Sequence, residues 1–236
     1  LGSLPLLRSH ALVISGIRRC GKSVLLHQFI RNEKENVFYV NFADIRLYGF
    51  SSSDFQLLDE LIRKSGRNIM FFDEIQIADG WELFVRQLLD RSMRVMITGS
   101  NARMLSAELG THLTGRHISK ELFPFSFNEY CSFFSISGSK EGFLSYLSKG
   151  GFPEFLKTNN IEILSYLIED IIHRDIITRY GVRDVQGLKN ICIYLLSNFA
   201  RPFSPSKLTS IAGVRSASTV LEYISYFESC YLVNVV

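Results

Sequence analysis

The chain has 236 residues, of which 47% are apolar and 21% are charged, and its formal net charge is +3. This length allows one large domain or two small ones, and the composition is ordinary for a globular protein with a hydrophobic core. A net charge this small gives no argument for nucleic-acid binding by itself.

The cysteines, the apolar runs and the two ends of the chain exclude several classes of protein. The four cysteines are widely separated and form no C-x-x-C pair, so the sequence indicates neither a disulfide framework nor a zinc site. No run of about 18 apolar residues predicts a membrane span, and the first residues lack the basic region of a signal peptide. We therefore expect a cytoplasmic protein. Because the chain begins without Met and ends in an apolar run, we also expect both ends to be cut from a longer protein.

The segment at residues 12–30 has the pattern of a strand, a glycine-rich loop and a helix. An apolar run at residues 12–14 precedes the loop GIRRCGKS at residues 16–23, and apolar residues with helical spacing follow it. The loop matches G-x-x-x-x-G-K-[ST], a pattern that binds phosphate groups. The alternative is a chance Gly-rich turn before an ordinary helix, and the flanking strand and helix favour the phosphate site.

The residue types of the loop explain how it would hold a nucleotide. Gly16 and Gly21 let the backbone curl so that its N–H groups point inward, and the start of the helix adds its positive dipole end. Lys22 can reach the β- and γ-phosphates, and the Ser23 hydroxyl can bind Mg²⁺. The remaining loop residues predicted to line the nucleotide are Arg18, Arg19, Cys20 and Val24. Because Lys22 already covers the phosphates, a structural or interdomain role is favoured for the two arginines.

Buried strands alternate with amphipathic helices from this loop to residue 123. We expect strands at residues 37–42, 69–72, 94–98 and 118–123, and helices at residues 54–64, 81–90 and 102–109. Continuous apolar strands that alternate with helices predict an α/β fold in which helices cover both faces of a parallel sheet.

The character of the sequence changes after Pro124. We expect helices at residues 127–134, 140–148, 161–179, 185–199, 206–212 and 216–229, a turn at 150–153 and a strand at 231–236. The last helices and the strand have the outline of a winged helix. The predicted domains are an α/β core over residues 1–125, a helical lid or linker over 126–180 and a winged helix over 181–236.

Two acids, Asp73 and Glu74, follow the strand expected at residues 69–72. Ligands bind at the carboxyl edge of open parallel sheets, where such residues emerge. Asp73 is suited to hold Mg²⁺ directly or through water, and Glu74 is suited to orient and deprotonate an attacking water. Two solvated acids at a strand end are the alternative, and the phosphate loop upstream favours catalysis.

Polar residues also follow the strand expected at residues 94–98. Ser100 or Asn101 could contact the γ-phosphate or the water, although either could instead be the N-cap of the next helix. The sequence does not choose between the two residues. Arg116 could neutralise transition-state charge on the nucleotide of a neighbouring subunit, or it is a surface arginine in a turn.

Several segments together resemble a poorly characterised group of prokaryotic AAA-type ATPases that is related to archaeal and STAND-like ATPases. These are GIRRCGKS, FFDEIQ with Trp81 shortly after it, ITGSNARMLS, LTGRHISKELFPFSFNEY and GGFPEF, which cover nearly the whole chain in order. The resemblance implies a P-loop NTPase core of the ASCE/AAA type, in which the strand bearing Asp73 is not adjacent in sequence to the phosphate-loop strand. It also implies a winged helix and a C-terminal domain of unknown function, and we expect the latter to be absent from this chain.

The same resemblance implies roles for four residues. It makes Ser100 or Asn101 the sensor of the γ-phosphate and puts Arg116 near the arginine-finger position. Pro153 lies in a turn similar to the G-x-P turn of related signalling ATPases, where the proline packs near the adenine. A plain loop between helices is the alternative for this turn.

The helix expected at residues 216–229 would be the recognition helix of a winged helix. It contains no Lys or Arg and includes the acids Glu222 and Glu228. Neutralisation of phosphates dominates affinity for DNA, and only Arg215 and Lys207 lie nearby. DNA therefore stays a weakly supported partner, and packing or contact with a protein partner is favoured.

The sequence thus predicts Mg²⁺-dependent binding and hydrolysis of ATP. The alternative is a nucleotide-gated switch that binds a protein or DNA partner or self-associates, with hydrolysis only as a reset. A kinase is disfavoured, because Glu directly after the metal-binding Asp is typical of hydrolases. The choice of ATP over GTP rests on the resemblance and on the absence of an N-K-x-D motif.

Overall fold

The computed structural model of the chain describes residues 7–32, 36–101, 113 and 115–236. The chain divides into two compact units, one made of Leu1–Gly16 and Cys20–Pro124 and the other of Ile17–Arg19 and Phe125–Val236. Three residues in the middle of the glycine-rich loop therefore belong to the second unit. Among the described helices, none has the length and apolar character needed to cross a membrane.

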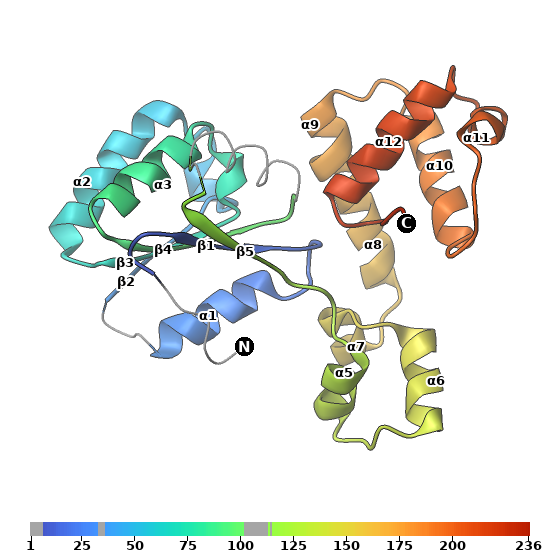
Figure 1. Ribbon diagram of the computed structural model, residues 1–236, viewed down its shortest axis with the longest axis horizontal. Helices are drawn as coiled ribbons and strands as arrows, with labels where there is room; N and C mark the ends of the chain where they lie inside the picture. The colour runs from blue at the N-terminus through green and yellow to red at the C-terminus, as the bar shows by residue number, and fades with distance from the viewer. Residues whose placement is uncertain (1–6, 33–35, 102–112, 114) are drawn as a thin grey trace. The chain divides into compact units, whose positions relative to one another are not determined.

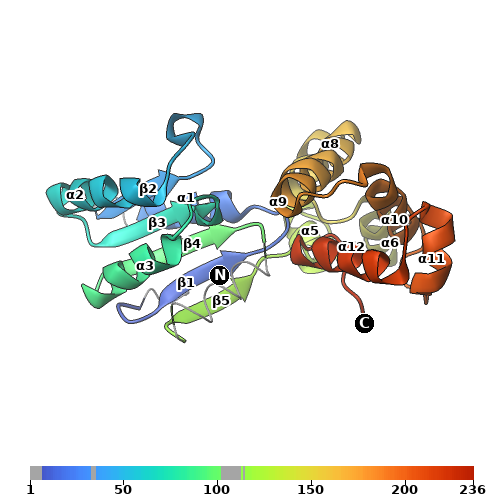
Figure 2. The same ribbon diagram turned by 90° about the horizontal axis from the view of Figure 1, so that it is seen from above.

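The first unit is built on a parallel sheet of five strands, which Figures 1 and 2 show side by side. The strands are β1 (Ala11–Ser15), β2 (Val37–Asn41), β3 (Ile69–Asp73), β4 (Arg94–Gly99) and β5 (His117–Glu121). Their order is β2-β3-β4-β1-β5, and every neighbouring pair is parallel. The predicted parallel α/β sheet is confirmed, and β4 separates the strand before the loop from the strand that ends in Asp73.

Helices cover both faces of this sheet (Figure 1). Leu12 and Ile14 of β1 pack in the cluster that includes α1 (Lys22–Asn32), whereas Val13 packs in the cluster with α2 (Phe55–Ser65) and α3 (Trp81–Asp90). Side chains alternate between the faces of a strand, so two covered faces require the continuous apolar runs seen in the sequence. The helix expected at residues 102–109 lies outside the described residues.

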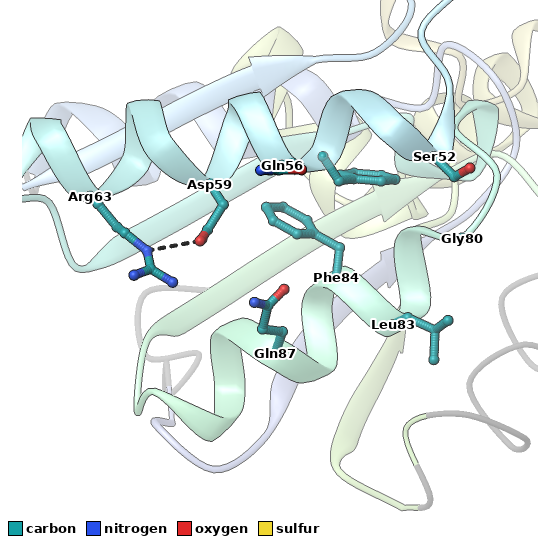
Figure 3. Close-up of a pocket in the computed structure, with 9 residues that line it drawn as sticks. Ser52, Gln56, Asp59, Arg63, Gly80, Leu83, Phe84 and Gln87 are labelled. Carbon is teal, nitrogen blue, oxygen red and sulfur yellow. Dashed lines mark hydrogen bonds and ion pairs between the residues drawn. The ribbon is translucent and has the colours of Figure 1, made fainter.

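Aromatic rings fill the space between α2 and α3. Phe55 and Phe84 stack with their ring centroids 4.6 Å apart, and Figure 3 shows the ring of Phe84 between the two helices. A hollow of about 460 Å³ opens beside them, and Asp59 in its wall accepts a hydrogen bond from Arg63 Nε at 2.8 Å. The residues that line this hollow include none of the residues predicted to bind nucleotide.

Apart from its three loop residues, the second unit is helical in the part that the structure describes. Its helices are α5 (Phe127–Phe134), α6 (Lys140–Lys149), α7 (Pro153–Thr158), α8 (Glu162–Asp170), α9 (Thr178–Tyr180), α10 (Val185–Ser197), α11 (Pro205–Ala212) and α12 (Ala217–Ser229). The helix expected at residues 161–179 forms as α8 and α9 joined by a π-helix, Ile171–Ile177. Such π-helices are rare in proteins, and those that occur often lie at functional sites.

The strand expected at residues 231–236 was a wrong prediction, and the winged helix is not confirmed. The helices α10, α11 and α12 pack against one another, but residues 122–236 contain no strand. Tyr231 has a left-handed φ of 60°, and the Leu232 N–H donates to the carbonyl of Phe227 in a turn typical of helix ends. Because the Val235 N–H donates to Glu228 Oε1 at 3.2 Å, this segment bonds to α12 and not to a neighbouring strand.

Candidate functional site

The glycine-rich loop at residues 16–23 joins β1 to α1 through an unusual backbone. Gly16 and Gly21 have φ values of 151° and 109°, and Arg19 has a left-handed φ of 63°. A Cβ on Gly16 would lie 2.1 Å from the carbonyl oxygen of Leu122, a backbone atom that cannot easily move. The first glycine is therefore required by close packing as well as by its backbone conformation.

Lys22 is the first residue of α1, and its buried side chain turns back across the loop. The side chain is 4% exposed, and its Nζ donates to the carbonyl oxygen of Gly16 at 2.9 Å. The same ammonium lies 4.0 Å from Glu74 Oε1. The first N–H groups of a helix lack helical partners and its dipole favours anions there, so a buried cation at this point is suited to phosphate. Ser23 follows with a partly exposed side chain, and Val24 is largely exposed.

Asp73 and Glu74 come together at the carboxyl end of β3. Asp73 Oδ1 accepts a hydrogen bond from the Thr98 hydroxyl, and Oδ2 accepts one from the Tyr39 hydroxyl at 3.2 Å. Burial and the carboxylate of Asp73 raise the pKa of Tyr39, so this phenol remains a donor. Glu74 leaves the strand with a left-handed backbone, φ 52° and ψ 41°.

The Glu74 carboxylate is held by two donors on one oxygen. Its Oε2 accepts hydrogen bonds from Gln76 Nε2 at 2.5 Å and from the Ser100 hydroxyl at 3.1 Å. Asn101 follows Ser100 and is buried. The structure therefore brings Ser100 to Glu74, while the helix that either residue could cap lies outside the described residues.

The oxygen atoms at this edge suit a magnesium ion. Mg²⁺ prefers hard oxygen donors, and proteins usually bind it through one or two carboxylates together with substrate phosphates and waters. Asp73 supplies a carboxylate and Ser23 a hydroxyl. Over the described ranges, no group of three or more His, Cys, Asp or Glu side chains could hold a metal by itself. The two residues predicted as metal ligands have the right chemistry for a metal shared with phosphates.

Three residues at this site received no role in the sequence analysis, namely Tyr39, Gln76 and Thr98. Thr98 lies in β4, which ends at Gly99, and the period of two in a strand would give a side chain at position 100 the same face as Thr98. In the same way, Tyr39 lies two positions before Asn41, and Asn41 pairs with Asp73 in the sheet register. Strand periodicity could have marked these two as neighbours of the acids.

Arg18 and Arg19 lie in the second unit, where both pair with carboxylates. Arg18 donates to the buried Asp175 through two nitrogens, whereas Arg19 reaches Glu154 and Asp170, each at 3.3 Å. Contact of these arginines with phosphate stays a prediction. Cys20, between them and Gly21, is buried, and burial raises the pKa of its thiol.

Arg116 lies at the amino end of β5, whereas the loop follows the carboxyl end of the neighbouring β1. Its Nη1 contacts Asp90 Oδ1 at 2.5 Å, and its Nε donates to the Ser9 carbonyl at 3.2 Å. The structure thus does not bring Arg116 to Lys22 and Glu74 of the same chain. Its action on the nucleotide of a neighbouring subunit stays a prediction.

Pro153 is the first residue of α7, a position where proline is favoured because no helical N–H is lost. A Cβ on Gly151 would lie 2.2 Å from the carbonyl oxygen of Phe125, so the preceding glycine is required by packing. A contact between Pro153 and an adenine stays a prediction.

Comparison with known proteins gives the family of the chain. A family model described as an AAA domain matches residues 8–131. One described as a domain of unknown function matches residues 140–236, so a domain of that description is present, contrary to the expectation from the resemblance. An uncharacterized protein of Methanocaldococcus jannaschii is 33% identical over an alignment that covers 94% of this chain and 55% of that protein. An uncharacterized protein of Haemophilus influenzae is 34% identical over an alignment that covers 93% of this chain and 60% of that protein. The chain therefore spans little more than half the length of these relatives.

Solved structures resemble the chain at low scores. The RuvB Holliday junction branch migration motor of Thermotoga maritima has a TM-score of 0.36 and 15% identity, and the match covers 93% of this chain and 79% of the RuvB chain. A chain of the Pnkp1/Rnl/Hen1 complex has a TM-score of 0.31 and 23% identity, covering 60% of this chain and 45% of its own. Neither likeness carries an argument about function. The AAA model alone covers more than half of the sequence, and the resemblance deduced from the motifs is confirmed. The chain belongs to the family of AAA domains.

Proposed function

We propose that this chain binds ATP with Mg²⁺ at the loop of residues 16–23 and hydrolyses it. Membership of the AAA-domain family supports nucleotide binding. The main support for hydrolysis is the position of Glu74, whose Oε1 lies 4.0 Å from Nζ of Lys22. A carboxylate beside the cation that would hold the γ-phosphate is suited to act on a water that attacks this phosphate. The choice of adenine rests on the family.

Each residue of the site has a distinct part in this proposal. Lys22 and the N–H groups at the start of α1 would bind the β- and γ-phosphates. A magnesium ion held by Ser23 and Asp73 would neutralise charge on these phosphates. Glu74 would accept a proton from the attacking water, and Ser100 or Asn101 would bind the γ-phosphate.

The test measures release of phosphate and binding of a fluorescent ATP analogue, with GTP as competitor. Glu74→Gln should lower turnover by about 100-fold or more while the dissociation constant for ATP changes little, since a general base acts only in the chemical step. Lys22→Ala should lose binding. The matched control is Glu60→Gln, which changes an exposed acid on α2. Equal turnover of wild type and Glu74→Gln would remove Glu74 from the mechanism, and a wild type that binds no nucleotide would refute the proposal.

A nucleotide-gated switch is the second candidate, and the membership of Ile17–Arg19 in the second unit favours it. Because these residues are also part of the phosphate loop, a change of the loop between ATP and ADP states would act on the carboxylates that bind Arg18 and Arg19. Hydrogen exchange of Ile171–Ile177 should then differ between ADP and a non-hydrolysable ATP analogue. Equal exchange in both states would contradict this candidate.

A further inference from the structure

The hydroxyl of Thr98 connects the two acids at the end of β3. Thr98 is fully buried in β4. Its Oγ1 donates a hydrogen bond to Asp73 Oδ1 and accepts one from the backbone N–H of Glu74 at 3.2 Å. A hydroxyl has one donor hydrogen and two acceptor lone pairs, so both bonds can exist at once.

The backbone at Glu74 shows what this second bond holds in place. Its φ of 52° is in the left-handed region, which is costly for a residue with a side chain and persists only where the surroundings enforce it. Consecutive residues of a strand normally point to opposite faces. Here Thr98 and Ser100, two positions apart, bind the side chains of Asp73 and Glu74 respectively. The left-handed turn thus brings two adjacent acids to the same side.

A buried threonine in a strand could simply be a packing residue, because β-branched side chains suit strands. In that case valine, which has nearly the same shape, would serve equally well. What distinguishes Thr98 is that the partners of its hydroxyl belong to the proposed metal ligand and the proposed general base. Loss of the hydroxyl would leave a buried carboxylate oxygen and a partly buried N–H without this partner.

We propose that Thr98 is a positioning residue for hydrolysis, whose hydroxyl fixes Asp73 and Glu74 in one arrangement. This inference rests on the proposed function, since it assumes that these acids serve the metal and the attacking water. Thr98 would act through these two acids. Partners that orient metal ligands typically change metal affinity or activity by about 10- to 100-fold when they are removed.

The experiment compares Thr98→Val, which lacks the hydroxyl, with Thr98→Ser, which keeps it. Turnover and KM for ATP are measured together with the affinity of the ATP-bound protein for Mn²⁺, followed by electron paramagnetic resonance. Thr98→Val should lower both turnover and Mn²⁺ affinity by about 10- to 100-fold and leave metal-free nucleotide binding unchanged. Thr98→Ser should stay within about threefold of wild type, because the hydroxyl bonds remain.

The matched control is Thr209→Val in α11, where the hydroxyl donates to the Ser206 carbonyl at 2.6 Å. This variant should match wild type in every measurement. Wild-type turnover and Mn²⁺ affinity in a folded Thr98→Val would overturn the inference. If Thr98→Val does not fold, a tenfold loss of turnover and Mn²⁺ affinity in Thr98→Ser would overturn the inference. Such a loss would mean that packing of the side chain, and not its hydroxyl, determines both quantities. A wild type without turnover refutes the proposed hydrolysis, whereas Mn²⁺ affinity still tests the role of Thr98.

Discussion

Arg18 donates two hydrogen bonds to Asp175, from Nε to Oδ2 at 2.9 Å and from Nη2 to Oδ1 at 2.7 Å. Asp175 is only 3% exposed and lies in the π-helix Ile171–Ile177. Two parallel bonds between a guanidinium and a carboxylate are among the strong hydrogen-bonding arrangements in proteins. A residue of the phosphate-loop motif is therefore anchored in the interior of the second unit.

Asp175→Ala should lower the free energy of unfolding by about 3–5 kcal/mol, because it removes one partner of a largely buried ion pair with two hydrogen bonds. The double variant Arg18→Met with Asp175→Leu should recover most of this loss, since apolar residues can replace a buried pair. Urea denaturation followed by circular dichroism measures both effects.

Arg19 provides the matched control in the same loop. Its partners Glu154 and Asp170 are about as exposed as ordinary surface residues, and both distances are 3.3 Å. Exposed pairs contribute about 0–1 kcal/mol, so Arg19→Ala should change stability little. Equal losses for Asp175→Ala and Arg19→Ala would contradict the distinction between the two arginines.

Gly16→Ala should disrupt both the fold of the first unit and nucleotide binding. Its Cβ would meet the Leu122 carbonyl oxygen at 2.1 Å, so the segment after β5 must move away from β1. Gly21→Ala has no atom within 4 Å of its new Cβ and strains only the backbone at a φ of 109°. Thermal unfolding should therefore show a larger loss for Gly16→Ala than for Gly21→Ala. The reverse order would show that space near Leu122 is not limiting.

The buried thiols of the second unit should make stability fall at high pH. Burial raises the pKa of Cys192 and of Cys230 from 9.0 to about 11. Between these values the unfolded chain ionises its thiols while the folded protein keeps them protonated. Each thiol then lowers the free energy of unfolding by up to about 1.4 kcal/mol per pH unit.

Comparison with Cys192→Ala isolates this effect from other groups that titrate in the same range. The variant lacks the packing of the thiol at every pH, and it also lacks the pH-dependent loss of stability that comes from ionisation of this thiol. The stability advantage of wild type over Cys192→Ala should therefore shrink as pH rises from 9.0 towards 11. A constant difference between the two urea midpoints over this range would contradict the raised pKa.

The sheet and its two acids could be predicted from the sequence because the signals are local. The apolar run at residues 69–72 is buried on both faces, and the carboxyl ends of parallel strands meet at one edge. Lys22 and Glu74 could therefore be expected to lie close together before their distance was known.

Other features depend on contacts between distant residues, which spacing along the chain does not contain. Asp175 is 157 residues away from Arg18, and nothing around it in the sequence marks it as a partner. The π-helix also interrupts a segment whose apolar spacing is that of an ordinary α-helix. At residues 231–236, an apolar run predicts a strand, but a strand forms only where another strand offers a hydrogen-bonding partner.

Gln76 should be needed for rapid hydrolysis but not for nucleotide binding. It is buried, and its Nε2 shares Glu74 Oε2 with the Ser100 hydroxyl. Gln76→Leu removes one of two donors that orient the proposed base, and a small displacement of such a group can cost up to about 100-fold in rate. Turnover should fall while the dissociation constant for ATP stays unchanged. The control Gln87→Leu, in the exposed part of α3, should match wild type.

A cycle with Ser100→Ala shows whether Gln76 and Ser100 act on the same oxygen. Because both donate to Glu74 Oε2, their effects on turnover should be non-additive, whereas independent residues would give additive effects. The cycle requires turnover of wild type, of both single variants and of the double variant, with ATP affinity measured for each. Wild-type turnover in Gln76→Leu would show that Ser100 alone orients Glu74. Additive losses would show instead that Ser100 acts elsewhere, as expected for a residue that contacts the γ-phosphate.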